Sequence, residues 1–305
     1  MFDHVTVRVS DRGESERFYA AVLAALDRPP TYSGEDLAEW NDFSLCQATR
    51  ACPPTKRLHV GFAASSPEQV DAFWQSGTEA GFLDDGRPGL RPRYRDDYYG
   101  GFLRDPDGNS VEAVHHSDVR PGGIDHLWVR VADLDASRGF YEVAAPHAGM
   151  RLVDEHQDRV RFAGDGGSMS LVTGPSTEGL HIAFAASDDA TVEAFHRAAT
   201  AAGYADHGAP GERPQYHDGY YAAYVLDPDG TNVELVHPQR RGRPDRVRAD
   251  RPSAGGGGLQ GSRATLRAAA GVGHAGREEA GRSPDGVHRA GEDACALVAA
   301  RLRGG

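Results

Sequence analysis

The chain repeats itself, and this duplication constrains its fold more than any other feature of the sequence. Residues 1–118 align without a gap on residues 123–240 at a constant shift of 122 positions, and about 42 of the 118 pairs are identical. Any fold that packs one copy must therefore also pack the other. We predict two domains, residues 1–118 and 122–239, followed by a separate segment, residues 240–305.

Each copy ends in a predicted β-hairpin that carries one glutamate. The turn is Asp-Pro-Asp-Gly at 105–108 and again at 227–230. Proline presets φ, aspartate bonds its own backbone and glycine takes a positive φ, so these four residues favour a tight turn. The apolar and aromatic runs beside each turn predict two antiparallel strands, and the second strand bears Glu112 or Glu234.

A weaker repeat divides each copy into two. A histidine opens an alternating strand, and a phenylalanine follows 14 residues later in a helix-like segment, at four places: His4 and Phe18, His59 and Phe73, His126 and Phe140, His181 and Phe195. We therefore predict four modules. The order β-α-β-β-β, taken twice in each domain, predicts an α+β fold with mainly antiparallel strands.

Two predictions concern details within the modules. Residues 3–9 alternate with period two, which places the side chain of His4 on one face of a strand and the neighbouring valines on the other. Residues 84–97 and 206–218, which lead to the two hairpins, are polar and contain several glycines and prolines. We expect both of these stretches to be loops.

Composition limits the class of protein. No stretch approaches the ~18 apolar residues of a membrane span, and the chain enters a strand at Phe2 without a secretory signal, so we expect a cytoplasmic protein with no membrane partner. Its three cysteines, Cys46, Cys52 and Cys295, are too few and too unevenly placed for a disulfide framework.

Charge separates the last segment from the rest. The chain has a net charge of −12; residues 240–305 contain 13 arginines and 7 acidic residues, so this segment is about +6 and the remainder about −18. An acidic folded part argues against nucleic-acid binding. The segment is rich in Arg, Gly and Ala without apolar periodicity, which is typical of disorder, although a basic tail can also contact an anionic partner.

The residues with chemical potential are two strand-borne histidines and one strand-borne glutamate in each copy: His4, His59 and Glu112, then His126, His181 and Glu234. Two imidazoles and a carboxylate form the facial triad of mononuclear iron(II) oxygenases, and the same set binds zinc or manganese. One histidine at a strand start is more often a surface or hydrogen-bonded residue, and duplication alone would repeat it. The pattern therefore allows a metal site without requiring one.

Four segments of the second copy form a set with counterparts in the first copy: 125–127, 137–141, 181–184 and 224–234. The last of them contains Asp-Pro-Asp-Gly-x-x-x-Glu. This set resembles the vicinal oxygen chelate superfamily, which includes glyoxalases, bleomycin-resistance proteins and extradiol ring-cleaving dioxygenases. The resemblance covers both copies and leaves out residues 240–305.

The resemblance implies a fold and a metal. It implies paired βαβββ modules that form a half-barrel around one divalent ion, Fe²⁺, Mn²⁺ or Zn²⁺, in each active domain. The implied ligands are one set from each copy: His126, His181 and Glu234, and likewise His4, His59 and Glu112. Modules can pair within a chain or between chains, so a homodimer is also allowed.

The resemblance also implies a function. We expect a metal-dependent enzyme, a dioxygenase or a lyase/isomerase of the glyoxalase type, that acts on a small oxygen-rich metabolite chelated to the metal through neighbouring oxygens. The alternative is a metal-free protein of the bleomycin-resistance type, which sequesters a drug or metabolite. A third hypothesis is an interaction protein that uses its basic tail.

The two copies differ at positions that matter for proton transfer. Tyr224 lies where extradiol dioxygenases carry an active-site tyrosine, and the first copy has Phe102 there. His217 lies about where those enzymes place a histidine, and the first copy has Arg95. Histidine and tyrosine can exchange protons in ways that phenylalanine and arginine cannot. We therefore expect the second copy to be catalytic, through Glu234, Tyr224 and His217.

Overall fold

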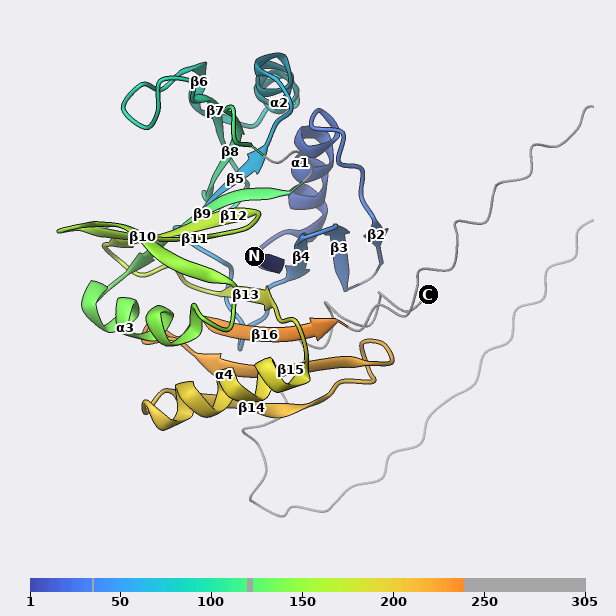
Figure 1. The fold of residues 1–305 in the computed structure, drawn as a ribbon. Coiled ribbons are helices and arrows are strands. Elements are labelled where there is room, and N and C mark those ends of the chain that lie inside the picture. Colours follow the sequence, from blue (N-terminus) through green and yellow to red (C-terminus); the bar gives the residue numbers. More distant parts are fainter. Residues whose placement is uncertain (35, 120–122, 239–305) are drawn as a thin grey trace, which may run out of the picture. The chain divides into compact units, whose positions relative to one another are not determined.

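A computed structural model describes residues 1–34, 36–119 and 123–238, and these contain the four predicted modules (Figure 1). We call residues 2–47 module 1, residues 59–115 module 2, residues 124–173 module 3 and residues 180–238 module 4. Each has one helix: α1 (Arg12–Ala24), α2 (Pro67–Glu79), α3 (Leu134–Ala144) and α4 (Asp189–Ala201). The α+β class is confirmed, while the predictions for residues 240–305 lie outside the described residues.

The strands form two sheets of eight. The first has the order β14 (Ala205–Glu212), β15 (Tyr220–Leu226), β16 (Asn232–Pro238), β13 (Leu180–Ala185), β1 (Phe2–Val9), β4 (Phe43–Gln47), β3 (Leu37–Trp40), β2 (Tyr32–Ser33). The second has the order β10 (Met150–His156), β11 (Arg159–Gly164), β12 (Gly167–Thr173), β9 (Ile124–Val131), β5 (His59–Ala63), β8 (Ser110–His115), β7 (Tyr99–Arg104), β6 (Leu83–Leu90).

Each sheet joins modules from different copies. Strand β1 of module 1 pairs antiparallel with β13 of module 4, and β5 of module 2 pairs antiparallel with β9 of module 3. The helices, unlike the strands, pack against a helix of the same copy: α1 contacts α2, and α3 contacts α4 (Figure 1). A half-barrel is therefore shared between the two copies. The domain boundaries 1–118 and 122–239 themselves stay a prediction.

The helices begin where the sequence supplies caps. The side chains of Asp11, Ser66, Asp133 and Asp188 each accept a hydrogen bond from a backbone N–H three residues later, which satisfies one of the unpaired donors of the first turn. Pro67 lies in the first turn of α2, where its missing N–H costs nothing. Capping thus fixes where each helix starts relative to the strand before it.

The predicted loops at 84–97 and 206–218 are wrong over their first halves. Residues 83–90 form β6 and residues 205–212 form β14, at one edge of each sheet. Glycine and proline are tolerated there because an edge strand has a ladder partner on one side only. The register of β6 on β7 shifts twice, around Gly86, where φ is 155°. These bulges interrupt the alternation by which a strand is recognised.

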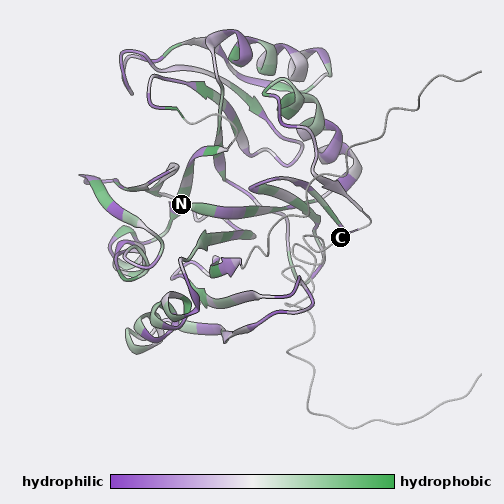
Figure 2. Ribbon diagram, turned by 45° about the vertical axis from the view of Figure 1, so that its right-hand side comes forward, coloured by the Kyte–Doolittle hydropathy of each residue, from purple (hydrophilic) through white to green (hydrophobic). Residues whose placement is uncertain are grey.

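Apolar residues of the two copies pack into a common core. Val5, Val7 and Val9 are buried on one face of β1, as the period-two pattern predicts, and the counterpart face of β9 contributes Leu127 and Val129. Figure 2 shows hydrophobic and hydrophilic stretches alternating within the same helices and strands. Among the described residues, the helices lack the length and apolar character needed to span a membrane.

The Asp-Pro-Asp-Gly turns are held by a buried carboxylate. Asp227 accepts hydrogen bonds from the backbone N–H of Thr231 and from the hydroxyl of Tyr141, at 2.8 and 3.1 Å. Asp105 repeats these contacts with Asn109 and Tyr19. Burial raises the pKa of Asp227 to about 6, although both hydrogen bonds oppose the shift. The ionised form of Asp227 is therefore destabilising in the folded protein.

We predict that Asp227→Asn makes the protein more stable than wild type above pH 6. The pKa of Asp227 is about 6 in the folded chain and about 3.9 when unfolded, so the wild type loses about 2 kcal/mol as pH rises from 4 to 7. Asparagine keeps an acceptor for Thr231 without this loss. Urea unfolding at both pH values measures the difference, and a mutant-minus-wild-type stability that does not change with pH would contradict the prediction.

Candidate metal centres

Three side chains from modules 2 and 3 converge on one face of the second sheet. His59 on β5, Glu112 on β8 and His126 on β9 bring one ligand atom each to within 4.8 Å of one another, and we call them the His59 cluster. The Nε2 atom of His59 lies 3.0 Å from Glu112 Oε2 and 3.0 Å from His126 Nε2. His126 Nε2 lies 3.3 Å from Glu112 Oε2.

Strand register brings these side chains together. Gly61 pairs with Glu112 on the parallel neighbour β8 and with His126 on the antiparallel neighbour β9. His59, two residues before Gly61, projects from the same face of β5. A Cβ atom at Gly61 would overlap the His126 ring, and one at Gly100 would overlap the Glu112 carboxylate. Two glycines therefore keep room for the cluster.

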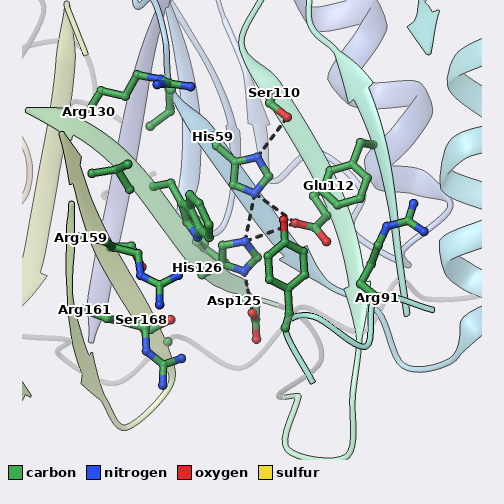
Figure 3. Close-up of a pocket in the computed structure, with 18 of the residues that line it drawn as sticks. His59, Arg91, Ser110, Glu112, Asp125, His126, Arg130, Arg159, Arg161 and Ser168 are labelled. Carbon is green, nitrogen blue, oxygen red and sulfur yellow. Dashed lines mark hydrogen bonds and ion pairs between the residues drawn. The ribbon is translucent and has the colours of Figure 1, made fainter. Parts of the chain in front are cut away.

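Hydrogen bonds orient the three side chains. His126 Nδ1 lies 2.8 Å from Asp125 Oδ2, and His59 Nδ1 lies 3.0 Å from the hydroxyl of Ser110. The Tyr98 hydroxyl donates to Glu112 Oε1 at 2.8 Å. Both imidazoles are thus held by Nδ1, which leaves Nε2 for a metal ion, an arrangement common to metal-binding histidines (Figure 3). The Asp125 side chain is thus the group that orients His126.

The spacing of the donor atoms fits a metal ion. Atoms held about 2.1 Å from an ion and at right angles to one another are about 3.0 Å apart, and about 3.4 Å apart in a tetrahedral arrangement. The three distances in the His59 cluster, 3.0, 3.0 and 3.3 Å, lie in this range. Two imidazoles and one carboxylate also leave positions open for a substrate.

Charges in the cluster are strongly coupled. Burial alone would lower the pKa of His126, but hydrogen bonds to Asp125 and Glu112 outweigh it and raise this pKa to about 10. Burial lowers the pKa of His59, against the effect of Glu112. For Glu112 burial acts upward, yet the two histidines together lower the pKa. The carboxylate is therefore ionised and ready to bind a cation.

A second group lies in the first sheet. His4 on β1, His181 on β13 and Glu234 on β16 form the His4 cluster. His4 Nε2 lies 3.2 Å from His181 Nε2, and His181 Nε2 lies 3.0 Å from Glu234 Oε2. His4 Nδ1 lies 2.9 Å from Asp3, and the Tyr220 hydroxyl donates to Glu234 Oε1 at 2.5 Å. Like the His59 cluster, the His4 cluster contains two histidines and one glutamate, and one of its histidines, His4, comes from the other copy.

The predicted grouping of these six residues is wrong in one respect. All six lie in the two clusters, but His4 and His126 are exchanged relative to the sets expected from each copy. The reason is the pairing of β1 with β13 and of β5 with β9, which carries the first histidine of each copy to the other copy's glutamate.

The two clusters differ in access. A cavity of about 1570 Å³ opens onto the His59 cluster and is lined by all three of its residues, while none of the His4 cluster lines it (Figure 3). Tyr94 at this cavity is 41 % exposed, whereas its counterpart at the His4 cluster, Tyr216, is 5 % exposed. Side chains of Tyr216, Tyr220 and Tyr224 fill the corresponding region around Glu234.

The predicted proton-handling residues lie beside the His4 cluster. The ring of Tyr224 is 6.4 Å from that of His181. His217 packs edge-on against Tyr220, 5.2 Å between ring centres, and its Nδ1 lies 2.9 Å from the carbonyl of Asp218. Their catalytic role stays a prediction. At the carboxylates the structure instead places Tyr98 and Tyr220, which are identical in the two copies.

His116 was missed by the sequence reasoning. Its Nε2 lies 3.3 Å from Asp125 Oδ1, and its ring stacks on Tyr98 at 5.9 Å between centres. It therefore contacts residues that hold both His126 and Glu112. The second copy has Pro238 at this position, so a comparison of the two copies could have revealed the difference.

Comparisons with known proteins agree with this fold. The family model for the glyoxalase/bleomycin resistance protein/dioxygenase superfamily matches residues 123–235. Glyoxalase I from Zea mays has a similar structure, with a TM-score of 0.58 and 19% identity over 77% of this chain and 92% of that one. A putative dioxygenase from Bacillus subtilis has a TM-score of 0.54 and 17% identity over 77% and 84%. A comparison with curated proteins gave no match.

The fold defines a class of protein, one built of paired βαβββ modules. The chain belongs to the glyoxalase/bleomycin resistance protein/dioxygenase superfamily through the residues that the family model matches. The structural similarities extend the same fold over both copies.

We predict that Gly61→Ala lowers the metal affinity of the His59 cluster by about tenfold, because the added methyl group displaces the His126 ring. The matched control is Ala183→Gly, at the equivalent position beside His4. Both are measured by metal-ion titration in a His4→Ala/Glu234→Ala background, so that one cluster remains. Equal affinities for the two variants would show that Gly61 is not needed for the ligand geometry.

Proposed function

We propose that the chain is a metal-dependent enzyme and that its reaction takes place at the His59 cluster. The observation that carries this proposal is the cavity, which gives a small molecule access to His59, Glu112 and His126. In this proposal these three residues hold one divalent ion, Fe²⁺, Mn²⁺ or Zn²⁺. A bound ion would supply Lewis-acid chemistry to a substrate that chelates it through neighbouring oxygens.

The surrounding residues have definite tasks in this proposal. Tyr98 donates to Glu112 Oε1 and so keeps Oε2 turned toward the histidines. Burial and the charge of Glu112 raise the pKa of Tyr98, so this phenol keeps its proton and acts as a fixed donor. Asp125 bonds both His126 and His116. His116 therefore lies where a proton can be held close to the cluster.

Two reaction types fit these residues, ring cleavage by oxygenation and glyoxalase-type isomerisation. Glu112 serves as a ligand in both, and it is the base in the second if a substrate displaces it. The similarity to glyoxalase I and to a putative dioxygenase does not favour one type over the other, because identities below 25% indicate a common fold and not a common reaction.

The competing site is the His4 cluster, with Glu234, Tyr224 and His217 as catalytic residues. The two sites are separated by matched double variants, Glu112→Ala/His126→Ala and His4→Ala/Glu234→Ala. Elemental mass spectrometry gives the metal content of each after purification and after reconstitution. Oxygen uptake with a catechol and an isomerase assay give the activity.

We expect the Glu112/His126 variant to lose one ion and more than about 100-fold of the activity, and the His4/Glu234 variant to keep most of the activity. Activity lost only in the His4/Glu234 variant would contradict our choice of site. A wild type that takes up no metal would reject the enzyme and favour a metal-free binding protein for a drug or metabolite.

A further inference from the structure

The floor of the cavity is a regular grid of side chains from three adjacent strands. The registers of β11, β12 and β9 arrange them in three rows: Ala163, Ser168 and His126; Arg161, Ser170 and Trp128; Arg159, Val172 and Arg130. All nine residues line the cavity. The first row holds a ligand of the His59 cluster, and the next two rows hold three arginines (Figure 3).

Three arginines share one neighbouring carboxylate, Asp154. Arg159 pairs with Asp154 at 2.8 Å and lies over the Trp128 ring. For Arg130 and Arg161, no carboxylate within the described ranges forms an ion pair with the guanidinium group. A chain with a net charge of −12 thus presents three arginines at one wall of its open cavity. The carboxylate beside them is Asp154, which pairs with Arg159 and lies opposite Arg161 in the strand register.

The corresponding grid of the first sheet lacks this feature. By strand register, Glu39 takes the place of Arg161, Leu37 that of Arg159 and Thr6 that of Trp128. Only Arg8 has an equivalent, Arg130. The duplication therefore accounts for Arg130 but not for Arg159 or Arg161, which are found only at the cavity of the His59 cluster.

Other cavity arginines have a structural explanation. Arg91 donates to the carbonyl of Arg87 and lies over the Phe102 ring. Arg213 makes the same contacts with Ala209 and Tyr224 in the other copy. A repeated contact of this kind positions an edge strand in both sheets. Within the described residues, neither Arg161 nor Arg130 makes this pair of contacts, with a backbone carbonyl and an aromatic ring.

We propose that the cavity binds a molecule with an anionic group, a carboxylate or a phosphate, through Arg161 and Arg130. Guanidinium groups bind both anions with paired N–H donors. Successive rows of the grid are roughly 6.5 Å apart along the strands, so the anionic group lies one to two rows from His126. The inference rests on the proposed function in that the same molecule extends to the His59 cluster.

The test is calorimetric titration of the full chain, metal-loaded and chelator-treated, with three probes: inorganic phosphate, succinate and the uncharged succinamide. The variants are Arg161→Gln, Arg130→Gln and the double variant, and the matched control is Arg8→Gln. Metal content is measured on every sample, and the chelator-treated sample separates binding by arginine from binding by the ion.

We expect the wild type to bind phosphate or succinate, whichever matches the natural group, and not succinamide. Each single variant should weaken binding about tenfold and the double variant about 100-fold, while Arg8→Gln leaves it unchanged. Anion binding that persists without metal but needs both arginines supports the subsite even if the enzyme proposal fails. Equal affinities of wild type and double variant, or no binding of either anion, would overturn it.

Discussion

The antiparallel pairing of the first strands of modules from different copies is the constraint on which both sites depend. Because β5 pairs with β9, His126 of the second copy reaches the side chains of His59 and Glu112 of the first copy. The pairing of β1 with β13 does the same for His4. The helices meanwhile pack within each copy, so the sites form where the copies meet.

The two copies carry similar candidate ligand sets in unequal surroundings. Gly61 and Gly100 leave room around the His59 cluster, where the second copy has Ala183 and Ala222. Tyrosines close the His4 cluster, and arginines line the approach to the other. One scaffold thus holds a buried set of candidate ligands and an accessible one.

Local features were predictable from the sequence. The turn at Asp227, the helix caps and the strand that carries His4 follow from short-range chemistry. The six candidate ligand residues came from the repeated pattern and the family resemblance, and all six lie in the two clusters. The pairing of modules was not predictable, because the first strand of a module has a sequence that suits pairing with a module of its own copy or of the other copy. The edge strand at Gly86 was not predicted, because its bulges interrupt the alternation of side chains. The open cavity was not predictable either, because Tyr94 and Tyr216 occupy the same position in the two copies but differ in how they are packed.

In the proposed enzyme, His59, Glu112 and His126 hold one ion together. The most direct measurement is an anomalous-difference map from crystals of the zinc-loaded protein. We expect a peak about 2.0–2.2 Å from Nε2 of both histidines and from a Glu112 oxygen. No peak among these three atoms, or an ion held by His59 and Glu112 together with His4, would contradict it.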